Sequence, residues 1–104
     1  MAHPSADEVR LQLAMAFGQG SGYMLATPAA LDVAVSSQAK VMERAMRNWA
    51  VTRYALTELV RLAGQIAAAR AAVEGRTEID RDHARYAIDA VLEVCPCLAR
   101  YEDQ

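Results

Sequence analysis

Two histidines and two cysteines are the residues of this sequence best suited to bind a metal ion or to activate a nucleophile. His83, Cys95 and Cys97 fall in the C-terminal part of the chain, and His3 lies near its start. Zinc takes four ligands, usually cysteine sulfur and histidine nitrogen. On one continuous helix His83 would lie about three turns before Cys95, which is too far for both to bind the same ion. The spacing therefore does not predict a metal site.

A catalytic cysteine needs a neighbouring base that raises its thiolate fraction. His83 is the histidine inside the expected folded body, and beside Tyr86 and Ala87 we expect it to be half exposed and structural. Cys95 and Cys97 are one residue apart, so a disulfide between them would close a strained ring. The sequence favours reduced thiols, which suit a cytoplasmic protein.

Acidic residues gather at Glu78, Asp80 and Asp82, just where a helix is expected to start. Carboxylates at that place interact favourably with the helix dipole, which explains them without catalysis. The glycine-rich segment "GQGSG" lacks the lysine and the preceding strand of a phosphate-binding loop. We therefore expect a protein that is not an enzyme and needs no cofactor.

Composition places these residues in one domain. The chain has 104 residues, 54% of them hydrophobic, and a net charge of −2. That length suits a single core over 1–104, with 1–4 and 102–104 frayed. Nothing at the start resembles a secretion signal, and no run reaches the roughly 18 apolar residues of a membrane span. The net charge argues against nucleic-acid binding driven by overall charge.

Helix start and stop signals divide the chain. Ser5 and Glu8 fit a capping box, Thr27 and Pro28 fit a cap followed by proline, and Gly75 fits a helix end. Asn48 and Thr52 favour an end and a new start, although one bent helix through this region is also consistent with the sequence. We expect helices over about 6–17, 28–48, 52–74 and 81–94.

Apolar residues recur along these helices every three or four positions, which predicts buried stripes. The fold class is therefore all-α, a compact bundle of four main helices with room for a short fifth after Pro96. The expected stripes are Leu31, Val35, Ala39, Met42, Met46 and Trp49 in the second helix, and Leu56, Leu59, Val60, Ala63, Ile66, Ala67 and Ala71 in the third.

The stretch "ELVRLAGQIAAARAAVEGRTEIDRDHARYAI" carries a resemblance to two families. Its Arg61-Leu62-Ala63, Gly75-Arg76, Ile79, Asp82 and Ala87 follow the order of the helical lid of AAA+ ATPases of the MoxR, magnesium-chelatase and replicative-helicase type. The same pattern is similar to the C-terminal half of a histone fold. The resemblance spans 27–91.

The AAA+ resemblance implies a lid-like component that works with an ATPase partner chain. This sequence departs from the pattern, because Tyr54 stands where the lid carries its ATP-sensing arginine and Arg53 is one residue out of register. No Walker lysine loop is present in the 104 residues, so the chain is not a complete AAA+ ATPase.

The histone resemblance implies a nucleic-acid-binding protein that would present Lys40, Arg44, Arg47 and Arg53 to phosphates. A solvated helix face accounts for the same residues, and the acidic total favours that interpretation.

Our preferred expectation is a non-catalytic interaction or assembly domain that self-associates. More apolar residues are present than one small core needs, and methionine and tryptophan suit adaptable helical interfaces. The expected contact residues are Met42, Met46, Trp49, Leu98 and Tyr101.

Overall fold

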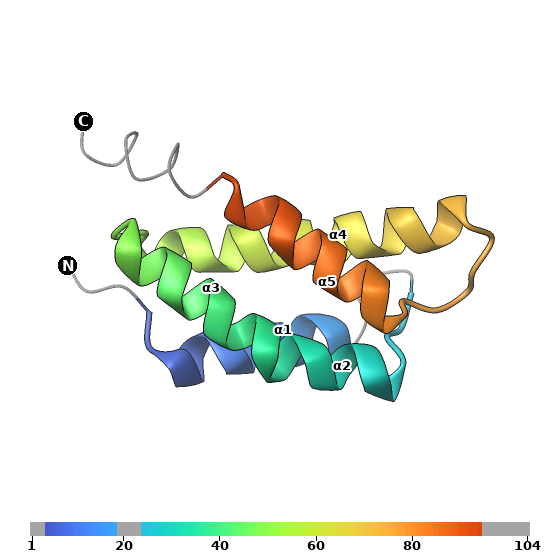
Figure 1. The fold of residues 1–104 in the computed structure, drawn as a ribbon, viewed down its shortest axis with the longest axis horizontal. Helices are drawn as coiled ribbons and strands as arrows, with labels where there is room; N and C mark the ends of the chain where they lie inside the picture. Colours follow the sequence, from blue (N-terminus) through green and yellow to red (C-terminus); the bar gives the residue numbers. More distant parts are fainter. Residues whose placement is uncertain (1–3, 19–23, 95–104) are drawn as a thin grey trace.

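The computed structural model describes residues 4–18 and 24–94, and in these ranges the chain forms helices and no β-strand. Figure 1 shows the long helix α4 and the shorter, antiparallel helix α5 packed over a layer made by the three helices that precede them. The all-α bundle predicted from the sequence is confirmed. The helices are α1 (Ala6–Gly18), α2 (Pro28–Val35), α3 (Ser37–Asn48), α4 (Arg53–Val73) and α5 (Arg81–Leu92).

The first two helices start as the sequence predicts. The Ser5 hydroxyl accepts from the Glu8 N–H at 3.1 Å, and the Ser5 N–H donates to the Glu8 carboxylate at 3.3 Å. Thr27 accepts from the Ala30 N–H at 3.1 Å, with Pro28 in the first helical position. Each such cap stabilises its helix by about 1 kcal/mol, because it satisfies N–H groups that lack a partner within the helix.

The expected helix over 28–48 is interrupted, and this corrects the sequence interpretation. α2 ends at Val35 and α3 begins at Ser37. Between them the Ser36 hydroxyl donates to the Asp32 carbonyl, and Ser36 has φ −111° and ψ −94°. A serine that bonds to its own helix offers the backbone an alternative to the helical pattern. The single helix expected over 28–48 is therefore two consecutive helices, α2 and α3.

α3 and α4 are separate helices, which settles the alternative of one bent helix. α3 ends in a turn in which the Val51 N–H donates to the Met46 carbonyl at 2.8 Å. Ala50 stands in that turn with φ 53°, in the left-handed region. α4 ends in the same kind of turn at Gly75, which has φ 74° as its predicted helix-end role requires.

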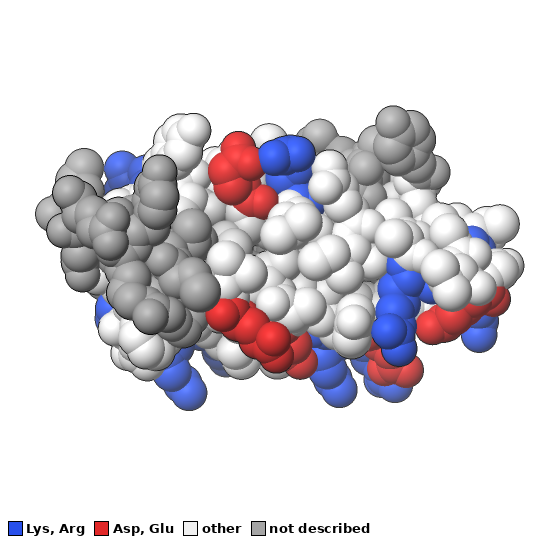
Figure 2. Space-filling model, turned by 90° about the horizontal axis from the view of Figure 1, so that it is seen from above, with Lys and Arg blue, Asp and Glu red and all other residues white. Residues whose placement is uncertain are grey.

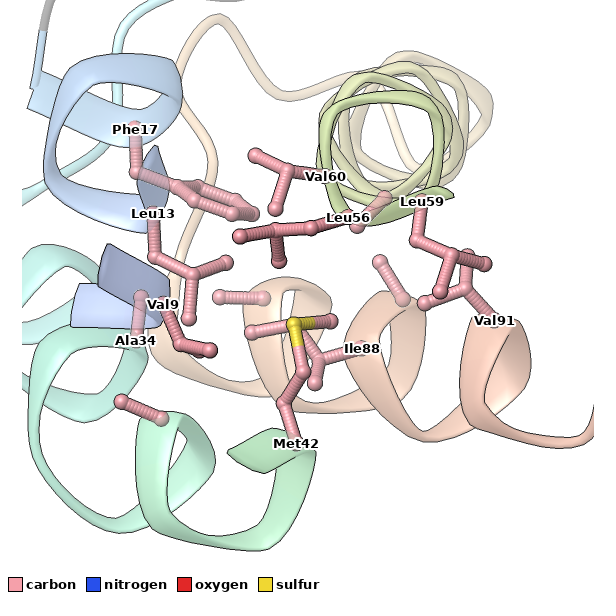
Figure 3. Packing of buried hydrophobic residues seen from close by; sticks show 14 of the residues in the cluster. Val9, Leu13, Phe17, Ala34, Met42, Leu56, Leu59, Val60, Ile88 and Val91 are labelled. Atoms are coloured by element: carbon pink, nitrogen blue, oxygen red, sulfur yellow. The ribbon is translucent and has the colours of Figure 1, made fainter. Parts of the chain in front are cut away.

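The core lies between the two layers (Figure 3). Its largest side chains come from four helices, which explains why each helix shows an apolar residue every three or four positions. Several alanines of α4 and α5 are fully buried, and their small side chains allow neighbouring helices to pack closely. The main core residues are Val9, Leu13 and Phe17 of α1, Met42 and Met46 of α3, Leu56, Leu59 and Val60 of α4, and Ile88 and Val91 of α5.

A short backbone pairing sets the start of α5. The Thr27 N–H donates to the Ile79 carbonyl and the Ile79 N–H donates to the Leu25 carbonyl, both at 2.9 Å. Ile79 is fully buried, so the connection between α4 and α5 is anchored in the core. This anchor places Asp80 and the first turn of α5 against the C-terminal end of α4.

Candidate functional site

The structure corrects the expected contact residues. Met42 and Met46 are fully buried on the inner face of α3, so neither has surface to offer a partner and their assignment as contact residues is wrong. Trp49 is 48% exposed at the C-terminal end of α3 and keeps its assignment as an expected contact residue. Leu98 and Tyr101 lie outside the described residues, as do Cys95 and Cys97.

An apolar face runs along the outer side of α4 and α5. We define this α4–α5 face by Leu62, Ile66, Ala69 and Val73 of α4 together with Tyr86 of α5. Val73 is 87% exposed, Tyr86 46% and Leu62 38%. Spacings of four, three and four residues bring the α4 members into one row along the helix. Apolar side chains in such a row remain in water unless another molecule covers them.

Figure 2 looks onto the side of the molecule where α4 lies, and much of the surface there is uncharged, with acidic and basic side chains toward its edges. An open groove of about 520 Å³ is part of this face. The row on α4 forms one wall and α5 supplies the other. The groove is lined by Ile66, Ala69, Arg70, Val73, Glu74 and Tyr86.

The polar members of the groove are held in place by one another. The Arg70 guanidinium lies over the Tyr86 ring, 4.2 Å from its centroid. The Arg70 Nε is also 3.7 Å from the Glu74 Oε2. Stacking of this kind fixes a long side chain against an aromatic face and contributes roughly 0.5–1 kcal/mol when exposed. One end of the groove therefore has a set shape.

His83 lies behind this end of the groove, and its burial corrects the expectation of a half-exposed residue. It is 4% exposed. Its Nδ1 accepts from the Asp80 N–H at 2.9 Å, and its Nε2 is 2.8 Å from the Glu74 Oε1. Because a backbone N–H can only donate, Nδ1 carries no proton, and the neutral ring has its hydrogen on Nε2.

This geometry gives His83 a structural role. Both ring nitrogens are engaged, so neither is free to take a proton from a substrate or to bind a metal ion. His83 occupies the third position of the helix, where glutamate or glutamine usually returns a hydrogen bond to the capping residue. A hollow of about 190 Å³ beside it is lined mainly by charged side chains.

The hydrogen bond from His83 is the main reason why the pKa of Glu74 is lowered, and the positive charges of Arg70 and Arg76 act in the same direction. Glu74 is therefore ionised at neutral pH. Glu74 lines both the hollow beside His83 and the groove of the α4–α5 face. It therefore connects the buried histidine to the groove.

The basic residues expected to meet phosphates are all exposed, but they fall into two groups. Lys40, Arg44 and Arg47 lie on the outer side of α3, and Arg47 is 3.5 Å from Glu43. Arg53, at the start of α4, makes a two-point ion pair with Glu8 of α1, at 2.6 and 3.0 Å. In this arrangement Arg53 ties two helices together and its guanidinium is occupied.

Sequence reasoning missed the α4–α5 face, although a signal was present. It assigned Ile66 to the buried stripe, whereas the structure packs Ile66 only partly against the core. Leu62, Ile66, Ala69 and Val73 form a second apolar row, on the side of α4 next to the core stripe. A long helix with two apolar rows has one row more than a two-layer bundle covers.

Within the described residues no group of three or more histidine, cysteine, aspartate or glutamate side chains could hold a metal ion. None of the helices described there is long and apolar enough to cross a membrane. Comparison of the sequence with family models, with curated proteins and with solved structures gave no match.

Proposed function

We propose that this chain is a non-catalytic interaction domain that self-associates through the α4–α5 face. One observation carries the proposal: Val73, Tyr86 and Leu62 stay exposed beside an apolar groove, although the same chain buries a complete core elsewhere. Exposed apolar groups that are contiguous, rather than scattered, are typical of surfaces that another protein covers.

The charges around the face favour a second copy of the chain as the partner. At one end Arg61 pairs with Glu58, and at the other Arg70 pairs with Glu74. Each end is thus neutral in itself, and the residues between them are uncharged. A surface that meets its own copy must not repel itself, and this one carries no net charge that would do so.

The size of the face predicts a weak association. The row from Leu62 to Val73 extends about 16 Å along the helix. Burying a side chain such as Val73 contributes roughly 1.5–3 kcal/mol. A few such side chains must also offset the loss of free motion on association. We therefore expect dissociation constants in the range of about 10 μM to 1 mM, corresponding to roughly 4–7 kcal/mol.

The test is the molecular mass as a function of concentration, measured by sedimentation equilibrium on the wild type and on Val73→Lys. The lysine is compatible with folding, because residue 73 is exposed at the end of α4, where a cation suits the helix dipole. Leu11→Lys on α1, at a position 60% exposed, is the matched control.

The wild type and Leu11→Lys should gain mass with concentration, and Val73→Lys should stay monomeric. A wild type that is monomeric throughout this concentration range overturns the proposal. So does a series in which Leu11→Lys loses association and Val73→Lys keeps it.

A second candidate is nucleic-acid binding by the outer side of α3. The observation in its favour is that Lys40 and Arg44 lie one turn apart and exposed, with Arg47 following on the next turn. DNA binding that weakens with salt, and weakens further in Arg44→Ala and Arg47→Ala, would support it. Equal mobility of DNA with and without the protein at low salt would exclude it.

A further inference from the structure

His83 is connected to the α4–α5 face by an unbroken series of contacts. The Asp80 N–H donates to Nδ1 of the ring at 2.9 Å, and Nε2 of the ring lies 2.8 Å from Glu74. Glu74 lies 3.7 Å from Arg70, and Arg70 stacks on Tyr86. The series begins at a buried ring and ends at two residues that line the groove.

We infer that protonation of His83 weakens self-association through the α4–α5 face, so that the buried ring makes the surface sensitive to pH. The inference rests on the proposed function, because it concerns the regulation of that same face.

The reason lies in the hydrogen-bonding capacity of the ring. A second proton must go to Nδ1, which then becomes a donor and can no longer accept from the Asp80 N–H. Two donors would face each other at a site that is almost closed to water, where an unsatisfied polar group is costly. The charged ring must therefore turn away from Asp80.

The movement reaches the surface through Glu74. A charged ring attracts the Glu74 carboxylate more strongly than the neutral ring does, so Glu74 follows the ring as it turns and moves away from Arg70, which lies 3.7 Å from it. Arg70 then loses the carboxylate that balances its charge beside the Tyr86 ring. The groove gains positive charge where a second copy would place apolar side chains and its own Arg70.

Other charged groups also surround the ring. The hollow beside His83 is lined by Arg70, Glu74, Arg76, Asp80, Asp82 and Tyr86. Of the other helices that pack on α5, α2 carries one titratable residue, Asp32, which is exposed. Gln38 of α3 bonds to Arg85 and Asp89, further along α5.

The variant His83→Gln separates the titration of the ring from its hydrogen bonds. Glutamine keeps one acceptor for the Asp80 N–H and one donor for Glu74, and it does not titrate. His3→Gln removes the other histidine of the sequence and is the matched control. Histidine ordinarily changes its charge between about pH 5 and 8, so the comparison is made at about pH 7.5 and 5.5.

Sedimentation equilibrium should show that the wild type and His3→Gln associate about two- to tenfold more weakly at the lower pH, the size that one lost hydrogen bond gives. His83→Gln should associate equally at both. Equal association of the wild type at the two pH values, or the same loss in His83→Gln, overturns this inference alone. A wild type that is monomeric at both values overturns the proposed function.

A second readout reports on the contacts inside one chain. Nitrogen-15 spectra should show the neutral His83 ring with its proton on Nε2, and the Tyr86 ring signals should shift as His83 gains its second proton. The inference is contradicted if the proton of the neutral ring is on Nδ1, or if the Tyr86 ring signals do not shift when His83 is protonated. Either result holds whatever the state of association.

Discussion

The ends of α3 and α4 can be compared directly, because both helices stop in the same hydrogen-bonded turn. In each turn one N–H bonds back five residues, from Val51 to Met46 at 2.8 Å and from Arg76 to Ala71 at 2.9 Å. Each turn also contains one residue of positive φ, which is Ala50 after α3 and Gly75 after α4.

The residues that close the two turns lie in different surroundings. Val51 is fully buried beside the core, whereas Arg76 is exposed and lies 3.4 Å from Asp80. The end of α3 is thus held by apolar burial, which outweighs the backbone strain of an alanine of positive φ. The end of α4 is held by glycine and by polar contacts, including the bond between His83 and Glu74. Only the second kind of anchor depends on protonation.

The largest expected effect comes from weakening the apolar anchor, the buried contacts that hold the end of α3. Met46→Ala removes a fully buried side chain next to Val51, and we expect a loss of about 2–5 kcal/mol in the free energy of unfolding. Urea denaturation measures it. Met15→Ala on α1, at an exposed position, should cost less than about 0.5 kcal/mol. Equal costs at the two sites would show that burial does not hold the end of α3.

The next effect concerns the glycine of the α4 turn. Gly75→Ala should lower the free energy of unfolding by about 1 kcal/mol. A Cβ at this position would meet no atom within 4 Å, so the loss comes from the backbone alone. Urea denaturation should show it without a change in the slope of the transition. An unchanged midpoint would mean that α4 can end in another way.

The reverse substitution should act in the opposite direction. Ala50→Gly relieves the left-handed alanine after α3, and we expect a gain of about 0.5–1 kcal/mol, reduced by the greater freedom of glycine in the unfolded chain. Thermal unfolding should show a midpoint raised by a few degrees. A lowered midpoint would indicate that Ala50 makes packing contacts that offset its strain.

The smallest effect is the acid sensitivity of the polar anchor, the contacts between His83 and Glu74 that help to hold the end of α4. The pKa of Glu74 is lowered in the folded chain, chiefly by its hydrogen bond with His83. Its contribution to stability is therefore complete above the ordinary glutamate value of about 4.3 and is lost as the pH falls below it. Thermal midpoints measured from about pH 7 to pH 3 should fall less steeply in Glu74→Gln than in the wild type.

Glu8→Gln is the comparison for that experiment, because the pKa of Glu8 is also lowered, mainly by its bond to the Ser5 backbone. Glu8 lies at the other end of the molecule from Glu74. Identical acid profiles for the wild type and Glu74→Gln would mean that the polar anchor contributes nothing.

The sequence predicted best where neighbouring residues determine the outcome. The caps at Ser5 and Thr27 and the turn at Gly75 each depend on side chains within a few positions, and all three are confirmed. The break at Ser36 was not predicted, because serine also occurs within helices and no proline or glycine marks the place. The positive φ of Ala50 was not predicted either, because alanine also occurs within helices and no glycine marks the turn.

The α4–α5 face and the burial of His83 depend on contacts between distant parts of the chain. Ile66 follows a helical apolar pattern, but α5 crosses α4 so that the groove beside Ile66 stays open. His83 is buried because the pairing of Ile79 with 25–27 places the first turn of α5 against Glu74. Neither the crossing nor that pairing can be read from a helical period.

Amide NMR spectra recorded over a dilution series test, residue by residue, whether the α4–α5 face binds a second copy of the chain. We predict that signals from Leu62, Ile66, Ala69, Val73 and Tyr86 move with concentration, while those from Leu11 and Arg44 stay in place. Signals that are independent of concentration everywhere, or that move on α1 or α3 instead, would contradict binding through this face.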